Sequence, residues 1–425
     1  MTLGTKEPTA KNGLVGRSRA QLSMLARELM LHAHLQDRSS IPAVLAIHPM
    51  SEALDIAIDE WMTASPVYTQ RMQRLMGFVG DGVGEIFKGI QLDVGMPHQF
   101  LDCGYDLHDD RHGEFWLRKC GALDDVLPMG EDMVRGMCHD IEDPTFDATA
   151  VATNRKARIR PFHRPPEVPT GGPACHWSVV IDDANDDVAD HPNLADVAAS
   201  TLASWPNDPP ASAEPGGWDD YAGPFDAHFE LEDLSQRALV LVATEFSVQA
   251  HLLARAMMAA VARRDGEDAA VEIGRKLFSG LGWIAAERLV PVLGVDDSPA
   301  AVAEVLRTCH LTLIADYLGL DVALPSADEV VVTLSADAPA LAEGDPFTLS
   351  ALLDLGADEI LESIVRGVNP RAQVVRTDGG DGVRAVWRIT IDAAAEPSPE
   401  PSTVEVVRFS TGPTAVFIRR RPLRR

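Results

Sequence analysis

Thiol and imidazole side chains gather in one stretch of this 425-residue chain, and they are the groups best suited to chemistry. Three of the five cysteines fall between Glu114 and Trp177, and two of these three directly precede a histidine. They are Cys120, Cys138-His139 and Cys175-His176. A thiol beside an imidazole can be a nucleophile beside its base, or two ligands of one metal. The stretch therefore predicts a site that is either catalytic or metal-binding.

Helical spacing gives the first hypothesis for that site. The residues around Cys138 predict a helix, on which positions four apart share a face. Cys138 would then lie beside Glu142, and His139 beside Asp143, as a base lies beside the carboxylate that orients it. The predicted catalytic residues are Cys138, His139, Asp143, Glu142 and, as an alternative base, His176. The competing interpretation of the His139 and Asp143 pair is a solvated helix face.

A metal site is the second hypothesis. Cys120, Cys138 and Cys175, together with one histidine, could hold zinc or iron with tetrahedral geometry. The intervals between these cysteines are wider than those of a zinc finger, and the chain contains no Cys-x-x-Cys pair. Cysteine is also a small hydrophobic residue that proteins often bury. Core cysteines are therefore the competing interpretation.

Basic residues between the second and third cysteines predict how a substrate is held. On a strand, Arg158 and Arg160 point to one side, and a guanidinium binds a carboxylate or phosphate through paired hydrogen bonds. His163 and Trp177 complete the predicted substrate-binding set. In a protein of net charge −27, such a cationic strand would collect a small anion. The alternative is an edge strand protected by charge.

The overall charge limits the classes of partner. Asp and Glu number 64 against 37 Lys and Arg, which argues against nucleic acid and anionic membranes because both require cationic surfaces. An odd count of five cysteines predicts free thiols in a reducing cytoplasm. The N-terminal residues lack the apolar core of a signal peptide, and no apolar run predicts a membrane span. We therefore expect a small anionic molecule as the partner, and a homo-oligomer stays open.

Self-comparison predicts that the chain contains one unit twice. Leu25-Ala26-Arg27 recurs as Leu253-Ala254-Arg255, Asn154 as Asn369 and Trp177 as Trp387, all in the same order. Each copy reads as amphipathic helices followed by an antiparallel meander. The predicted fold class is therefore α+β, with two tandem copies forming an intrachain pseudo-dimer. The predicted parts are a tail (1–19), a first copy (20–246, with an acidic insert at about 183–224) and a second copy (247–425).

The predicted elements follow this division. In the first copy we expect helices at about 20–35, 49–63, 66–91 and 129–153, strands at 114–118 and 175–181, and a hairpin near 229–243. In the second copy we expect strands at 329–333 and 383–391, a helix at 348–367 and a hairpin near 404–420. The acidic insert predicts a surface loop or a disordered segment, which Trp205 and Trp218 could pin to the core. The arginine-rich end, residues 419–425, predicts a solvated tail.

The second copy lacks the reactive residues of the first. Under the alignment Cys120 falls on Ser335, Cys138-His139 on Leu353-Asp354, Cys175-His176 on Ala385-Val386, and Arg158 and Arg160 on Gln373 and Val375. A set that is lost together while its scaffold survives is what a functional unit would leave behind. The alternative is a diverged repeat in which the cysteines are core residues, as Leu353 and Ala385 suggest.

The pattern around the three cysteines resembles the L-2-amino-thiazoline-4-carboxylic acid hydrolase family. The resemblance lies in a cysteine ending a strand (Arg118-Lys119-Cys120), a second before an acidic residue on a helix (Cys138-His139-Asp140) and a third in the last strand (Cys175-His176-Trp177). It covers about Glu114 to Ile181. It implies hydrolytic opening of a small ring acid that contains sulfur and nitrogen. The histidines, the acidic insert and the second copy depart from the family's pattern.

These observations lead to one expectation and one alternative. The expectation is a hydrolase or lyase that acts on a small carboxylate-bearing substrate through the cysteine and histidine site of the first copy, with or without a metal. The alternative is a non-catalytic protein that binds a small molecule or a metal, or that senses redox state. A scaffold that binds another protein is a third class of function.

Overall fold

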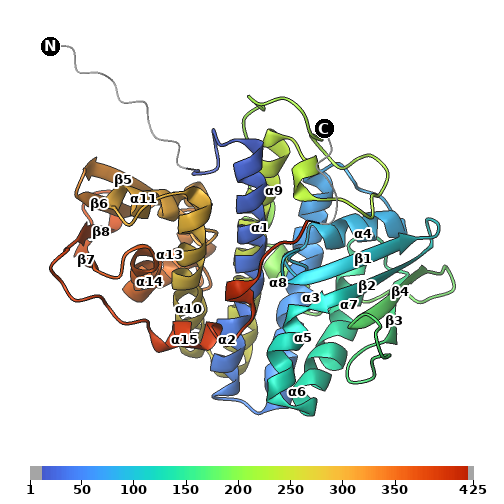
Figure 1. Ribbon diagram of the computed structural model, residues 1–425. Helices are drawn as coiled ribbons and strands as arrows, with labels where there is room; N and C mark the ends of the chain where they lie inside the picture. The colour runs from blue at the N-terminus through green and yellow to red at the C-terminus, as the bar shows by residue number, and fades with distance from the viewer. Residues whose placement is uncertain (1–11, 420–425) are drawn as a thin grey trace.

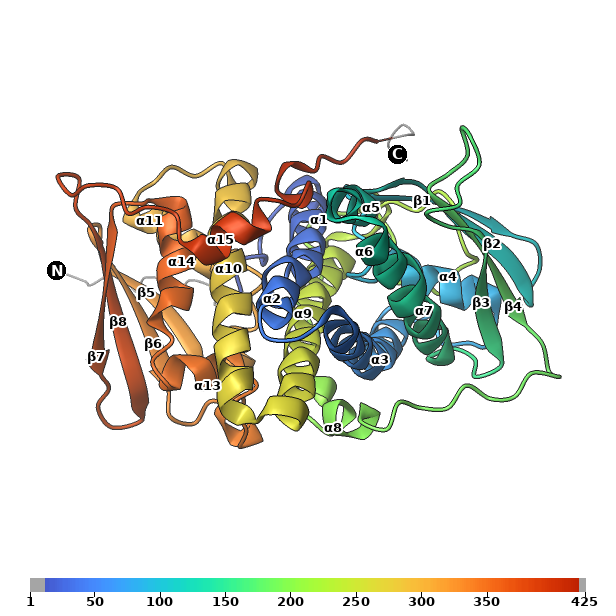
Figure 2. The same cartoon turned by 90° about the horizontal axis from the view of Figure 1, so that it is seen from below.

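A four-stranded antiparallel sheet lies at each end of the molecule, and the helices fill the space between the two sheets (Figures 1 and 2). The computed structural model describes residues 12–419. The fold is therefore α+β, as predicted. Each half of the chain supplies helices first and then one complete sheet.

The first half opens with long helices that begin and end at clear signals. They are α1 (Arg19–Leu35), α2 (Asp37–Leu45), α3 (Met50–Leu75) and α4 (Val83–Gln91). Ser18 caps α1 in a capping box with Gln21. The helix predicted at 66–91 is wrong because α3 ends before Gly77, whose φ of 70° favours glycine, and α4 starts after Gly82.

The first sheet has the strand order β1-β2-β4-β3, so the predicted meander is wrong: β3 lies at the edge and β4 pairs with β2. The strands are β1 (Leu101–Leu107), β2 (His112–Cys120), β3 (Ala157–His163) and β4 (Cys175–Ile181). Between β2 and β3 the chain forms α5 (Gly121–Val126), η1 (Leu127–Met129), α6 (Glu131–Arg135), η2 (Gly136–Ile141) and α7 (Glu142–Val151). The single helix predicted at 129–153 is thus divided, and η2 is a π-helical segment.

The second half repeats this arrangement in chain order. Its helices before the sheet are α9 (Gln236–Asp265), α10 (Glu267–Leu293), α11 (Pro299–Thr308) and α12 (Ala315–Leu318). Its sheet contains β5 (Leu320–Ser326), β6 (Glu329–Ser335), β7 (Ala372–Asp378) and β8 (Val383–Ile391), in the order β5-β6-β8-β7. Segments η5 (Leu341–Glu343), α13 (Leu349–Asp354) and α14 (Asp358–Val368) lie between β6 and β7. The helix predicted at 348–367 breaks at Gly356, where φ is 88°.

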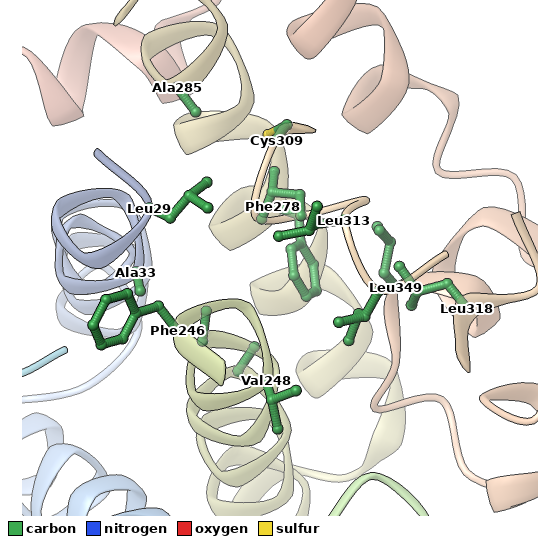
Figure 3. Close-up of a cluster of buried hydrophobic side chains, with 14 of the residues drawn as sticks. Leu29, Ala33, Phe246, Val248, Phe278, Ala285, Cys309, Leu313, Leu318 and Leu349 are labelled. Atoms are coloured by element: carbon green, nitrogen blue, oxygen red, sulfur yellow. The ribbon is translucent and has the colours of Figure 1, made fainter. Parts of the chain in front are cut away.

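The longest helix, α9, lies at the centre and packs against α1, α3 and α10 (Figure 2). Figure 3 shows side chains from α1, α9 and α10 meeting in one buried cluster, among them Leu29, Phe246 and Phe278. By length and composition α9 could cross a membrane, but 89% of its most apolar window is buried inside the protein. The apolar character of α9 is therefore what a central core helix requires.

Both predicted hairpins are wrong. Residues 229–243 form η4 (Leu231–Asp233) and the start of α9, which Ser235 caps. Residues 404–420 contain the end of α15 (Ser402–Val407) and η6 (Gly412–Thr414), and residue 420 lies outside the described residues. The boundary expected at 246/247 falls inside α9. The apolar residues of these two segments predicted strands, but in the structure they pack against neighbouring helices on more than one side.

The acidic insert crosses the surface and includes only short helical pieces, α8 (Leu194–Ala198) and η3 (Leu202–Ser204). Trp205 and Trp218 both pack against the main core, and Trp205 contacts Tyr317 with ring centroids 5.4 Å apart. The two tryptophans thus attach the insert to the protein. Of the residues in the predicted tail at the C-terminus only Arg419 is described, where it forms ion pairs with Glu230 and Glu232.

Candidate functional site

The first sheet divides the predicted site residues between its two faces. Side chains alternate along a strand, so Cys175 and Trp177 point toward the helices while His176 points to the outer face of β4. On β3, Ile159 is buried, whereas Arg158 and Arg160 lie on the outer face with His176. The strand prediction was correct, but its period of two separates the thiols from the groups expected to assist them.

On the outer face, the polar residues are paired with one another. His176 Nε2 lies 2.8 Å from Glu114 Oε2, and the ring of His163 is 5.9 Å from that of His176. His163 Nε2 donates to the carbonyl oxygen of Pro173 at 3.1 Å. These contacts place the predicted base His176 beside a carboxylate, on the opposite side of the sheet from the cysteines.

The two strand arginines serve the protein itself. Arg160 forms two hydrogen bonds to Asp147, at 2.9 and 2.8 Å. Asp147 also accepts from the backbone N–H of Ile159, which is unpaired within the sheet because β3 is an edge strand. Arg158 donates to backbone carbonyls, including that of Ala157 at 2.8 Å. The geometry therefore matches the alternative of a protected edge strand.

The three cysteines are buried on the inner face. Cys120, Cys138 and Cys175 are 7%, 3% and 4% exposed. Burial, reinforced by the nearby Glu142 carboxyl, raises the pKa of Cys120 to about 12 and raises the pKa values of Cys138 and Cys175 further. All three are thus protonated thiols at neutral pH, which are poor nucleophiles. Across residues 12–419, no three His, Cys, Asp or Glu side chains are arranged to hold a metal ion.

The expected His139 and Asp143 pair has other partners in the structure. His139 Nε2 donates to the carbonyl oxygen of Pro165 at 2.7 Å. Asp143 forms an ion pair with Arg164. The prediction assumed α-helical spacing, but His139 lies in the π-helical segment η2, whose wider turn shifts which positions share a face.

Asp143 has a counterpart in the second half. Arg164 lies 5.6 Å from the ring centroid of Trp177 and pairs with Asp143. In the second half, Arg376 lies 5.4 Å from the ring of Trp387 and pairs with Asp358 at 3.2 Å. Because this trio of Asp, Arg and Trp occurs in both halves, it supports the sheet rather than a reaction. Trp177 itself is 0% exposed and so cannot contact a substrate on the surface.

A cavity of about 490 Å³ lies between α3 and the segment that runs from η1 to α7. Its walls are largely apolar, and five of the chain's 13 methionines line it. These are Met50, Met96, Met129, Met133 and Met137. Pockets of roughly 300–1,000 Å³ with mainly apolar walls are typical small-molecule sites, and flexible methionines adapt to varied apolar surfaces.

A simple spacing in the sequence marks one wall of this cavity. Every fourth residue from 129 to 149 lines it, namely Met129, Met133, Met137, Ile141, Thr145 and Thr149. A spacing of four drifts around an α-helix of 3.6 residues per turn, and the wider π turn of η2 counters that drift. This spacing is a signal of the cavity wall in the sequence, and it lies in apolar residues rather than in thiols or imidazoles.

Two carboxyl groups in the cavity wall have oxygens without partners. Glu142 Oε2 and Asp37 Oδ1 are both buried and make no hydrogen bond within the described chain. Burial raises the pKa of Glu142 to about 8, although Arg164 acts to lower it. Burial likewise raises the pKa of Asp37 to about 6. Perturbed carboxyl groups in an apolar cavity are frequent at functional sites, and of the predicted residues Glu142 and Cys120 line this one.

The C-terminal part of the chain closes the cavity. Val406, Phe409 and Ser410 line it, and Figure 2 shows α15 beside α2. Asp125 of α5 holds this segment, because it accepts from Ser410 Oγ and from the backbone N–H of Thr411, both at 2.7 Å. The second half thus completes a site that the first half builds. Phe409 is 84% exposed, so it places an apolar ring at the rim.

Comparison of the chain with protein-family models, with curated proteins and with solved structures finds no match.

Proposed function

We propose that this protein binds a small, mainly apolar molecule in the cavity between α3 and η2–α7, and that Glu142 makes a polar contact to it. The observation that carries the proposal is an apolar cavity of about 490 Å³ whose wall contains a buried carboxyl oxygen without a partner. Leaving a buried polar atom unpaired is costly. A ligand group at Glu142 would remove that cost.

The second half supports the choice of Glu142. Asp143 and Asp358 occupy matching places in the two trios, and the residue before Asp358 is Ala357, which is 1% exposed. The glutamate is therefore not required by the scaffold. Glu142 differs between the two halves, whereas the adjacent Asp143 is repeated as Asp358. Glu142 is therefore the better candidate for a functional role.

A hydrolase or lyase is the second candidate function, and the pKa of about 8 at Glu142 favours it. A carboxyl group that is protonated at neutral pH can act as a general acid toward a bound molecule. In this version of the enzyme hypothesis, Glu142 replaces the buried thiols as the reactive group. The ring-opening activity implied by the cysteine pattern would then depend on protonation of a ring atom.

We also infer that the two halves derive from one duplicated unit, packed as a pseudo-dimer. The strand orders agree, and Trp177 and Trp387 each pair with a buried residue of the neighbouring strand, Phe115 and Val332; this pairing shifts β6 by two residues from the sequence alignment, which matches Phe115 with Val330. Asn154 and Asn369 make the same contacts: each accepts from the N–H two residues later at 2.9 Å, and each donates to a distant carbonyl at 2.9 Å. Along the sequence, the boundary between the two halves lies before α9, which starts at Gln236.

A fluorescent apolar probe tests the binding proposal. We expect N-phenyl-1-naphthylamine to bind the protein with about one-to-one stoichiometry. Ala57→Phe and Thr145→Phe fill the cavity from opposite walls and should abolish probe binding. Ala195→Phe, the matched control, makes the same change as Ala57→Phe on the exposed surface of α8 and should retain binding. Equal binding by all variants that remain folded would contradict the proposal.

A further inference from the structure

The charges around the cavity define the polar end of its ligand. We infer that the ligand is an apolar amine whose protonated head group binds Asp37, an inference that rests on the binding function proposed above. It reverses the anionic substrate expected from the sequence, because Arg158 and Arg160 lie on the outer face of the sheet and use their donors internally.

Acidic side chains outnumber basic ones in the cavity wall. Four carboxyl groups line the cavity. Among the lining residues in the described chain, Arg38 is the one arginine, and none is a lysine. The four are Asp37, Asp93, Asp125 and Glu142. Arg38 Nε donates to Asp125 at 2.9 Å, so its charge is already paired. His34 also lines the cavity, but burial lowers its pKa well below the usual range and keeps it neutral. A carboxylate ligand would therefore meet no unpaired cation among these groups.

The four carboxyl groups differ in what they still need. Asp125 accepts from Arg38, Ser410 and Thr411. Asp93 accepts from Tyr68 at 3.0 Å and from the N–H of Gly95 at 2.7 Å. These two are satisfied by the protein. Asp37 and Glu142 each retain an oxygen without a partner.

Asp37 is the better site for a cation of these two. Its Oδ2 accepts from Trp61 Nε1 at 3.2 Å, while Oδ1 makes no hydrogen bond within residues 12–419. Glu60 lies near Asp37, is 0% exposed, and also has both oxygens unpaired in that range. An ammonium group donates three hydrogen bonds. Its positive charge would offset the cost of burying the carboxyl groups of Asp37 and Glu60 close together. Trp61 lines the same part of the wall and supplies an indole, the aromatic ring that interacts best with cations.

A series of three ligands with one chain length tests the inference. Decylamine, decanol and decanoate are titrated against the bound probe at about pH 7.5, where the amine is charged and the acid ionised. We expect decylamine to displace the probe at concentrations roughly ten- to a hundredfold lower than decanol, the range of a charged hydrogen bond. Decanoate should be the weakest of the three.

Substitution of Asp37 locates the head group. Asp37→Asn should remove the preference for decylamine over decanol and leave the affinity for decanol almost unchanged. The control Asp124→Asn removes the same charge from an exposed position on α5 and should keep the preference. Asp37→Asn removes a buried carboxyl whose pKa is raised, so the variant should fold.

The outcomes separate the two levels of the proposal. If none of the three compounds displaces the probe, or the probe does not bind, the binding function itself fails. If decanol or decanoate binds as tightly as decylamine, or if Asp37→Asn retains the preference, the cavity binds apolar molecules but the amine inference is overturned.

Discussion

The two halves of the molecule share a scaffold but differ where α7 and α14 pack on their long helices. In the second half, α10 and α14 approach so closely that a Cβ on Gly282 would lie 2.9 Å from Ile364 Cγ1. Four residues of α14 there, Ile360, Leu361, Ile364 and Val365, are 0% exposed. In the first half, a cavity of about 490 Å³ lies between α3 and η2–α7. The halves thus differ in that a cavity opens beside η2–α7, although η2 and α3 approach each other equally closely at Gly136, where a Cβ would lie 2.9 Å from Leu54 Cδ1.

This difference shows which predicted residues belong to the scaffold. Asp143, Arg164 and Trp177 form a trio in the first half, and Asp358, Arg376 and Trp387 form the same trio in the second half. We therefore infer a structural role for Asp143 and Trp177. Cys138 and Cys175 are replaced by Leu353 and Ala385 in the sequence alignment, and both of these are 0% exposed. Glu142 is replaced by a buried alanine and faces the cavity instead. We therefore expect function at the cavity, whose wall includes Cys120 but neither Cys138 nor Cys175.

Exchange of the residues at the point of difference should have the largest effect. Ala357→Glu places a carboxyl group in a packed interior and should lower the unfolding free energy by about 3 kcal/mol or more. The reverse change, Glu142→Ala, removes a buried carboxyl group whose pKa is raised to about 8, so it should not lower the unfolding free energy at neutral pH. Urea unfolding of both variants measures the two values. Equal losses would mean that the halves do not differ in the proposed way.

Two carboxyl groups in the cavity wall should each contribute a decline of stability with rising pH. The folded protein holds the protons of Glu142 up to about pH 8 and of Asp37 up to about pH 6. The unfolded chain releases them near pH 4, so the unfolding free energy falls as pH rises through this window. A one-unit difference in pKa between the states is about 1.4 kcal/mol.

Two variants should separate the contributions of Glu142 and Asp37 to the dependence of the unfolding free energy on pH. Glu142→Gln should flatten the decline between about pH 6 and 8, and Asp37→Asn should flatten it below about pH 6. Urea unfolding at a series of pH values gives the slopes. A slope that is the same in Glu142→Gln as in the parent protein would show that this carboxyl group is ionised in the folded state.

The two tryptophans provide a smaller contrast. Trp387 Nε1 donates to the carboxylate of Asp358 at 2.8 Å, whereas the indole of Trp177 has the weak acceptor Cys175 Sγ as its partner. Phenylalanine at either position removes a similar volume, so Trp387→Phe should cost roughly 1–2 kcal/mol more than Trp177→Phe. Thermal or urea unfolding of the pair measures the difference. A larger loss for Trp177→Phe would indicate that its indole has a stronger partner than this sulfur.

Thiol reactivity should show the smallest effect. Cys120, Cys138 and Cys175 are buried and protonated, so an alkylating reagent should label them slowly in the folded protein and rapidly in urea. Mass spectrometry of each site reports the rates, and the same thiols in urea are the reference, because burial also raises the pKa of Cys103 to about 12. Rapid labelling of Cys138 in the folded state would revive the nucleophile hypothesis.

The sequence predicted the fold better than it predicted the site. Strand patterns at Glu114 and Glu329 and the recurrence of Trp177 at Trp387 gave the two sheets, because alternation is a local property. The hairpin predicted at 229–243 is wrong because α9 is buried on several faces, so its apolar residues do not show the helical period of 3.6 in the sequence. The structure separates some of the predicted site residues for two reasons: strand alternation places His176 and Cys175 on opposite faces of the sheet, and His139 lies in a π-helical turn, with a partner other than Asp143. The spacing of four from Met129 to Thr149 marks one wall of the cavity in the sequence, but the partnerless oxygens of Asp37 and Glu142 depend on contacts between distant segments.

A crystal structure of the protein with 10-bromodecylamine tests the central claim most directly. The account predicts an anomalous bromine peak inside the cavity, among the methionines of the η1–α7 wall, with the amine at Asp37. A peak in the second half or at the outer face of the first sheet, or an empty cavity at saturating ligand, would contradict it.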